Sequence, residues 1–190
     1  DIIDRYINGE SANSISKFNN TTNQRILKIL KENEVAIRDA SHAYRQYSID
    51  ETFFDVIDTQ EKAYILGLLW ADGCNKTYSN TITLSLQAED KKLLDDVNRL
   101  IGSNRPLRLE QKVNERCQDQ YVLSITNKHI SDVLESIGMC RAKSLILEFP
   151  TWLEDHLYPA FIRGMFDGDG HIANDSHHKA SIVGTKIICE

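Results

Sequence analysis

The chain lacks the features of secreted and membrane proteins. None of its apolar stretches approaches the roughly 20 residues that a membrane-spanning helix needs, and no secretory signal is visible in a sequence that begins with Asp1. Its 4 cysteines are scattered and none lies in a C-x-x-C pair, so neither a disulfide framework nor a zinc site is expected. Reduced thiols are the simpler interpretation. They predict an intracellular protein, in a bacterial or phage cytoplasm or in an organelle.

The chain also lacks a net positive charge. It has 22 basic and 28 acidic residues, which gives a net charge of −6. This is the wrong sign for a protein that binds nucleic acid through bulk charge. Residues 1–50 are balanced, with 7 basic and 7 acidic residues, whereas residues 51–150 hold 12 and 15 and residues 151–190 hold 3 and 6. Any binding of nucleic acid therefore depends on basic residues that are gathered on one face.

Two apolar stretches that each close on Asp-Gly organise the rest of the chain. They are residues 63–73 (AYILGLLWADG) and 160–170 (AFIRGMFDGDG). Positions four apart share a helix face, and glycine inside a helix costs about 1 kcal/mol relative to alanine. Each stretch alone could be an ordinary buried helix closed by a glycine. Two matching copies instead predict two helices that pack closely through stripes of small residues: Ala63, Gly67 and Ala71 in the first, Ala160, Gly164 and Gly168 in the second.

Such packing brings two acidic side chains together. Asp72 and Asp169 each end a predicted helix, where a carboxylate opposes the helix dipole and the two carboxylates repel each other. A divalent cation relieves both problems, and Mg²⁺ prefers carboxylate oxygens. We therefore predict a magnesium site at Asp72 and Asp169, assisted by the backbone carbonyls of Ala71 and Gly168.

The paired stretches resemble the two copies of the LAGLIDADG motif of single-chain homing endonucleases. The last two motif letters fall on residues 72–73 and 169–170, and the internal glycine falls on Gly67 and Gly164. The second copy keeps the earlier acid as Asp167, whereas the first has Trp70. The family binds metal through the last acid, so this departure does not threaten the metal site. The resemblance covers about residues 50–190.

The resemblance implies a hydrolase of intron or intein mobility. Such an enzyme makes a staggered double-strand break in a specific DNA site by Mg²⁺-dependent hydrolysis. By position, the family's catalytic lysine falls on Lys128 and its water-network residue on Gln87. A solvated lysine and a capping amide are the plain alternatives. An RNA maturase that assists intron splicing and a catalytically inactive DNA-binding regulator are the alternative functions, and retention of both aspartates disfavours the regulator.

The predicted fold class is α+β, with an antiparallel sheet. Strict alternation predicts strands at residues 81–86, 107–112 and 121–126, and apolar periodicity predicts helices around residues 93–101 and 130–137. One sheet face is expected to be apolar, with Ile82, Leu84 and Leu86 toward the helices, and the other polar. The polar face supplies candidate DNA contacts: Thr81, Thr83, Ser85, Arg108, Lys112 and Ser124.

These elements predict an αββαββα half-unit at residues 51–150. A second half-unit begins at residues 151–190, with strands expected at residues 170–172 and 179–184. Only 20 residues follow Gly170, so the second half-unit is expected to be incomplete. A separate polypeptide that completes it is therefore a predicted partner, besides double-stranded DNA, and the chain alone is expected to cut poorly.

Residues 1–50 predict a small all-α unit and its linker. Short helices in residues 1–31, two of them joined at Asn19-Asn20, resemble a helix-turn-helix. A plain three-helix packing unit is the alternative. Residues 32–58 are interpreted as a linker that either lies along a DNA backbone or stays solvated. In the helix-turn-helix interpretation, base edges are met by Thr22, Asn23 and Arg25, and a phosphate by Lys28.

Overall fold

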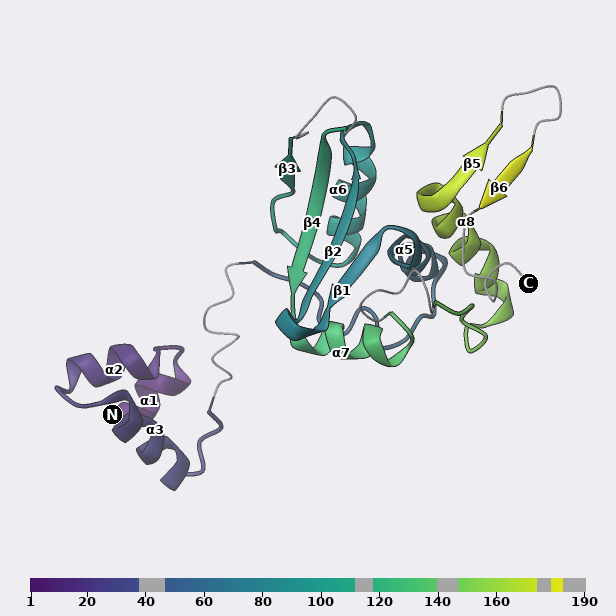
Figure 1. Ribbon diagram of the computed structural model, residues 1–190. Coiled ribbons are helices and arrows are strands. Elements are labelled where there is room, and N and C mark those ends of the chain that lie inside the picture. Colours follow the sequence, from purple (N-terminus) through teal and green to yellow (C-terminus); the bar gives the residue numbers. More distant parts are fainter. Residues whose placement is uncertain (38–46, 112–117, 140–146, 174–178, 183–190) are drawn as a thin grey trace. The chain divides into compact units, whose positions relative to one another are not determined.

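A computed structural model describes residues 1–37, 47–111, 118–139, 147–173 and 179–182 (Figure 1). The contacts divide the chain into two compact units, Asp1–Gln46 and Tyr47–Glu190, and each is described by itself. The predictions for Lys112 and for residues 183–190 lie outside the described residues. In the part that is described, no helix has the length and apolar character needed to cross a membrane.

The first unit contains helices α1 (Ile2–Ile7), α2 (Ala12–Phe18) and α3 (Asn23–Glu32), as the sequence predicts. Each helix begins after a side chain that accepts a hydrogen bond from a free backbone N–H: Asp1, Ser11 and Thr22. The turn between α2 and α3 includes Asn20, whose φ of 47° an asparagine tolerates well. Apolar side chains at helical spacing form the core of this unit: Tyr6, Ile15, Ile26 and Leu30.

Arg5 ties the end of α1 to the start of α2. Its Nε and Nη2 donate to the two carboxylate oxygens of Glu10 at 2.6 and 2.7 Å, and its guanidinium lies 4.0 Å from the ring centroid of Phe18. These charge-assisted hydrogen bonds, with one from Ser14, hold the pKa of Glu10 below its usual value. The pair joins two helices that are too short to be stable alone.

The second unit contains an antiparallel sheet, and its class is α+β, as predicted. The strands β1 (Gly73–Lys76), β2 (Thr81–Gln87), β3 (Arg108–Glu110) and β4 (Gln120–Thr126) lie in the order β1-β2-β4-β3. With the helices α5 (Gln60–Ala71), α6 (Lys91–Leu100) and α7 (Lys128–Ser136), the order along the chain is helix, strand, strand, helix, strand, strand, helix. Short 3₁₀ turns, η1 (Thr77–Ser79) and η2 (Ala88–Asp90), flank β2.

A second helix and strand pair follow in the same unit. After η4 (Asp155–Leu157), α8 (Tyr158–Asp169) runs beside α5. The strands β5 (Gly170–Ile172) and β6 (Ala180–Ile182) then pair in antiparallel fashion as a separate two-stranded sheet (Figure 1). Both strands fall where the sequence predicts them.

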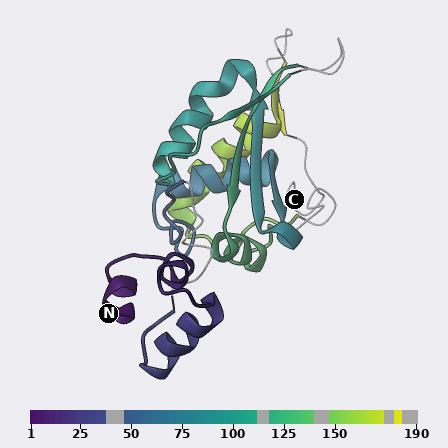
Figure 2. The same ribbon diagram turned by 90° about the vertical axis from the view of Figure 1, so that its left-hand side faces the viewer.

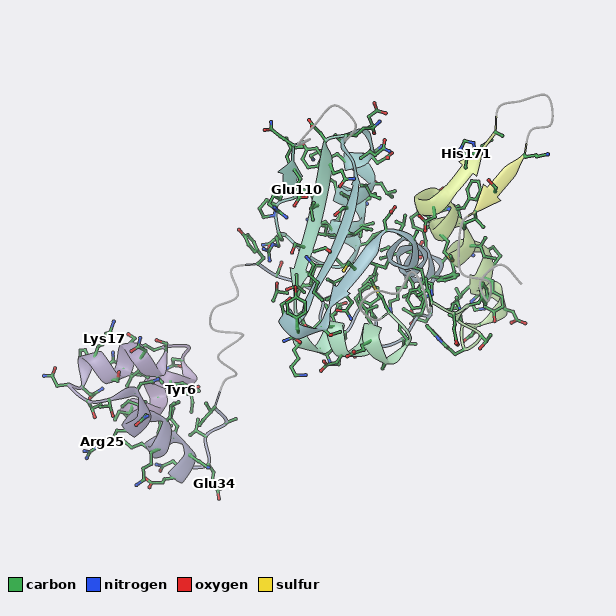
Figure 3. The ribbon with its side chains drawn as sticks, in the orientation of Figure 1. Tyr6, Lys17, Arg25, Glu34, Glu110 and His171 are labelled. Atoms are coloured by element: carbon green, nitrogen blue, oxygen red, sulfur yellow. The ribbon has the colours of Figure 1, made fainter. Side chains whose placement is uncertain are left out.

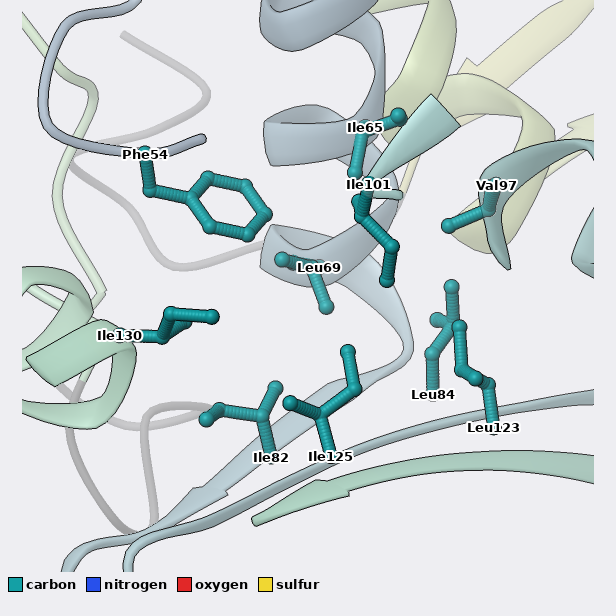
Figure 4. Close-up of a pocket in the computed structure, with 10 residues that line it drawn as sticks. All are labelled: Phe54, Ile65, Leu69, Ile82, Leu84, Val97, Ile101, Leu123, Ile125 and Ile130. Atoms are coloured by element: carbon teal, nitrogen blue, oxygen red, sulfur yellow. The ribbon is translucent and has the colours of Figure 1, made fainter. Parts of the chain in front are cut away.

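The apolar face of the larger sheet packs against the helices. Ile82, Leu84 and Leu86 are all less than 10% exposed and belong to one core with α5, α6 and α7. Figure 2, a view turned by 90°, shows α6 on one side of this sheet. The void between this sheet and the helices α5, α6 and α7 has a volume of only about 10 Å³ (Figure 4), which is room for a single water molecule. Because its lining is wholly apolar, the void is a packing defect of the core and no ligand site.

The interpretation of residues 32–58 as a linker is wrong for residues 47–58. Phe53 and Phe54 are 7% and 3% exposed and Ile57 is 9% exposed, so all three belong to the core of the second unit. The N–H of Asp50 also donates to the carbonyl of Ile101 at 3.0 Å. This segment has no helical or strand period, so its burial follows from tertiary packing that the sequence pattern does not reveal.

Candidate functional site at the paired helix ends

Helices α5 and α8 approach almost backbone to backbone. A Cβ added to Gly67 would lie 2.1 Å from the carbonyl oxygen of Phe161, and one added to Gly164 would lie 2.1 Å from that of Tyr64. No real Cβ atom tolerates such a distance to main chain. The prediction that these glycines are contact points is therefore confirmed. The matching distances show that a near-twofold axis relates the two helices.

This near-twofold axis relates two contacts of different chemistry. Tyr64 corresponds to Phe161 in the second motif, and Asp167 corresponds to Trp70 in the first. On one side, the hydroxyl of Tyr64 donates to Asp167 Oδ2 at 2.7 Å. On the other, the rings of Phe161 and Trp70 meet edge to face, with centroids 5.9 Å apart. Trp70 therefore has an aromatic partner across the helix pair, where the equivalent Asp167 has a hydroxyl donor.

Tyr64 is held as a hydrogen-bond donor. Partial burial raises the pKa of its phenol well above the usual value, and the carboxylate of Asp167 raises it further. The guanidinium of Arg163 lies 4.6 Å from the ring centroid of Tyr64, in the range of a cation–π contact. The phenol thus stays protonated at neutral pH and keeps its bond across the helix pair.

The acidic ends of the two helices meet where the sequence predicts. Asp72 follows the last residue of α5, and α8 ends at Asp169. A Cβ added to Gly168 would lie 2.9 Å from Asp72 Oδ2 and 2.4 Å from the Cβ of Ala71. The carboxylate of Asp72 therefore lies against the last turn of α8, in space that only a glycine at position 168 leaves open. Asp72 and Asp169 are both exposed.

The two exposed acids are compatible only with a magnesium ion that keeps water ligands. Within the described ranges, no group of three or more His, Cys, Asp or Glu side chains could hold a metal. Mg²⁺ is, however, commonly bound through one or two carboxylates while it retains several waters. Asp72 and Asp169, with the carbonyls of Ala71 and Gly168, remain the predicted ligands of such an ion.

The polar face of the sheet begins beside this site. Residues that pair directly across strands share a face, and Gly73, the residue after Asp72, pairs with Leu84. Asp72 is therefore level with Ser85. From Ser85 toward the start of β2, the polar face continues in two rows of paired residues, Cys74–Thr83–Ser124 and Lys76–Thr81–Thr126. Toward the end of β2, it continues in the row Gln87–Gln120–Glu110. Thr81, Thr83, Ser85 and Ser124 are half-buried on this face, as predicted.

The two other predicted catalytic residues lie at opposite ends of the sheet. Gln87 is exposed at the end of β2 that is nearer to Asp72. Lys128 begins α7 beyond the far end, since the preceding Asn127 donates its N–H to the carbonyl of Asn80. The ammonium of Lys128 lies 2.6 Å from Asp132 Oδ2. The structure thus brings Gln87, and not Lys128, toward the paired acids.

Two of the predicted basic DNA contacts have acidic partners. Arg108 forms an ion pair with Glu110 on the same strand, and Lys28 lies 3.7 Å from Glu32. Arg25, in contrast, is exposed on α3 (Figure 3), and no described acidic group lies within ion-pair distance of it. A DNA phosphate must compete with an internal carboxylate at Arg108 and Lys28 but not at Arg25.

The remaining polar side chains at the start of α3 keep their predicted places. Thr22 is the helix cap, and its hydroxyl accepts from the N–H of Arg25 at 3.3 Å. Asn23 is exposed in the first turn.

His171, near the second acid, is exposed on β5 (Figure 3), which is the solvated position expected of it.

The predicted αββαββα order includes a strand before residues 81–86, but the sequence does not show that this strand is β1, so Cys74 and Lys76 are not among the predicted contacts. The stretch Gly-Cys-Asn-Lys has neither alternation nor β-branched residues, so no strand signal marks it. What fixes the strand is Asn75, which is fully buried. Its amide donates to the carbonyls of Ser131 and Met139 at 2.9 and 3.1 Å, and its oxygen accepts from the hydroxyl of Ser131 at 2.7 Å.

Comparison with solved structures yields distant similarities, five chains in all. No family model matches the sequence, and no curated protein matches it. The solved structure of the N-terminal LAGLIDADG domain of DUF199/WhiA is similar, with a TM-score of 0.39 and 17% sequence identity. The match covers 66% of this chain and 58% of that chain, so this chain spans somewhat more than half the length of its structural neighbour.

Proposed function

We propose that this chain is a site-specific DNA endonuclease of the LAGLIDADG type. It would bind Mg²⁺ between the ends of α5 and α8 and hydrolyse a phosphodiester in each strand of a duplex. The observation that carries this proposal is the carboxylate of Asp72 against the backbone of Gly168, 2.9 Å from the place of a Cβ. The added Cβ would also lie 2.4 Å from the Cβ of Ala71, so the glycine lets the end of α5, with Asp72, come against the last turn of α8, which ends at Asp169.

The chemistry needs an activated water, stabilisation of charge on phosphorus and help for the leaving oxygen. A bound divalent metal supplies all three. The chain contributes the ligands Asp72 and Asp169, and the carbonyls of Ala71 and Gly168. It also fixes the distance between them through the glycine contacts of the helix pair. Gln87, at the same end of the sheet, is the side chain best placed to hold a water by hydrogen bonding.

The polar sheet face is the proposed duplex-binding surface. Its hydroxyls, from Thr81, Thr83, Ser85 and Ser124, can donate to and accept from base edges. Since the face begins level with Asp72, a duplex that lies on it brings a backbone phosphate to the acids. The first unit would add a second contact through α3, where no acidic group of the described residues pairs with Arg25.

A further partner is proposed for α8. Ile65 on α5 is 1% exposed under the sheet, whereas its twofold equivalent Ile162 on α8 is 49% exposed. A polypeptide that extends the β5–β6 sheet would cover α8 as the larger sheet covers α5. Addition of such a polypeptide should then raise the rate of double-strand cutting. An unchanged rate would count against this partner without touching the metal site.

The test of the endonuclease is a set of isosteric substitutions. Asp72→Asn and Asp169→Asn should each reduce Mg²⁺-dependent cleavage of a selected duplex site to background and leave binding nearly intact. Asp167→Asn is the matched control: it makes the same change two residues before Asp169, and its amide oxygen can still accept from Tyr64. Wild-type cutting by either of the first two variants would refute the metal-site assignment.

A DNA-binding regulator that does not cut is the second candidate. It is favoured by the ion pair of Lys128 with Asp132 at the far end of the sheet from the acids. A wild-type chain that binds a duplex site but does not cut it with Mg²⁺ or Mn²⁺ would favour this function. Preference for intron RNA over duplex DNA would instead indicate an RNA maturase.

A further inference from the structure

We propose that Lys76 is a specificity-determining residue that reads a guanine about four base pairs from the phosphate at Asp72. This inference rests on the proposed duplex-binding function of the sheet. It adds a base-reading residue from β1, the strand that leads directly out of the acidic helix end.

The register places Lys76 on the polar face. Lys76 pairs with Thr81, which in turn pairs with Thr126, and the hydroxyls of these two threonines lie 3.2 Å apart. Buried and half-buried residues alternate along β1, with Gly73 and Asn75 buried and Cys74 and Lys76 half-buried. The side chain of Lys76 therefore leaves the sheet on the face opposite to the core.

The ammonium of Lys76 is available for a ligand. Among the described residues, no carboxylate lies within ion-pair distance of it, unlike the paired Arg108 and Lys128. A charged group without an internal partner binds a ligand without first breaking an ion pair. On this face it is the basic side chain best suited to a new contact.

The backbone of Lys76 is fixed on both sides. The preceding Asn75 is anchored by its buried hydrogen bonds to Ser131 and Met139. After it, the carbonyl of Lys76 accepts from the hydroxyl of Ser79 at 3.2 Å. A side chain on such a fixed main chain loses less freedom when it binds, which favours selective contacts over loose ones.

The position that it reads follows from the length of β1. Four residues separate Asp72 from Lys76, and four residues of strand span about 13 Å. Along the axis of a duplex, one base pair rises about 3.4 Å, so the span equals about four base pairs for a strand that lies parallel to that axis. Lysine in the major groove pairs with the O6 and N7 atoms of guanine. We therefore expect guanine to be preferred at that position.

The test compares full-length wild type with Lys76→Gln and with Lys92→Gln in selections from a random duplex library. Lys92 is an exposed lysine of α6, on the helix-covered side of the sheet, so the control makes the same change away from the proposed surface. Lys76→Gln should lower discrimination for guanine at one position by roughly 5- to 150-fold, and glutamine favours adenine there. Lys92→Gln should leave the profile unchanged, and melting curves confirm folding.

Three other outcomes of this experiment would overturn the proposal, and each can be told from the others. A uniform loss of affinity with a shallower salt dependence and an unchanged profile would mean a phosphate contact, and it would overturn the assignment of Lys76 as a base reader. An unchanged profile and affinity would overturn it too. A wild-type chain that selects no duplex sequence at all refutes the proposed function, and the inference falls with it.

Discussion

Alanine at Gly67 tests the close packing that sets the distance between the two acids. Its added Cβ would lie 2.1 Å from the carbonyl oxygen of Phe161 and 2.9 Å from the N of Met165. An ordinary contact begins near 3.4 Å, so the helices must separate by about 1 Å. Neither atom can move alone, because both belong to the main chain of α8.

The expected cost follows from three contributions. Overpacking in a tight interface costs about 1–3 kcal/mol. Separation also weakens the hydrogen bond from Tyr64 to Asp167, and such a bond is worth about 0.5–1.5 kcal/mol. Against these, alanine gains about 1 kcal/mol over glycine in a helix. The free energy of unfolding should therefore fall by about 0.5–3.5 kcal/mol.

The near-twofold axis sharpens this prediction. Gly164 faces the carbonyl of Tyr64 at the same 2.1 Å, so Gly164→Ala should cost about as much as Gly67→Ala although its neighbours differ. Urea unfolding of the full chain measures both. A gain of about 1 kcal/mol at Gly67, the value for an uncrowded helix, would refute close packing.

Three further predictions concern single side chains. Tyr64→Phe should lower the free energy of unfolding by about 0.5–1.5 kcal/mol at neutral pH through the lost bond to Asp167. The folded pKa of this phenol is raised above its ordinary 10.0, so its contribution is present below pH 10 and is lost as the pH rises further; alkaline melts of wild type should show a loss that Tyr64→Phe lacks. Arg25→Ala should reduce discrimination at one base pair by about 1–3 kcal/mol, whereas the control Lys31→Ala, at the other end of α3, should not; equal profiles would exclude a base contact. The folded pKa of Glu10 is lowered from 4.5, so the first unit should lose stability as the pH falls below 4.5, and circular dichroism melts of Glu10→Gln should show a smaller loss over that range.

Local periodicity was sufficient to predict most of the fold of the second unit. The helix pair, the strands β2 and β4 and the helices α6 and α7 each carry an apolar repeat that matches their geometry. The glycines at positions 67, 164 and 168 could be predicted to be contact points because glycine destabilises a helix and is expected there only where a larger side chain does not fit. These same residues predicted that the acids at the two helix ends lie near each other.

The parts of the fold and of the site that the sequence did not predict depend on tertiary contacts, which leave no periodic pattern in the sequence. β1 forms because Asn75 is bonded to α7 and to the segment that follows it, and the sequence does not show which residues those are. Phe53 and Phe54 are in the core although nothing periodic surrounds them. The sequence also does not predict the ion pairs of Arg108 and Lys128, because they depend on side-chain conformation in the folded protein. These ion pairs decide whether the basic side chain is free to bind a ligand.

The two unlike contacts across the helix pair also determine which helices can exchange partners. If two copies of the protein swapped identical helices, an α8–α8 pair would set Asp167 against Phe161 twice, with no donor for either carboxylate. An α5–α5 pair would set Tyr64 against Trp70 twice and would lose the acceptor of the tyrosine hydroxyl. Only the mixed pair satisfies both sides. The interface therefore selects the mixed α5–α8 pair over either pair of identical helices, and an exchange between two copies can keep both contacts only if α5 of one copy pairs with α8 of the other.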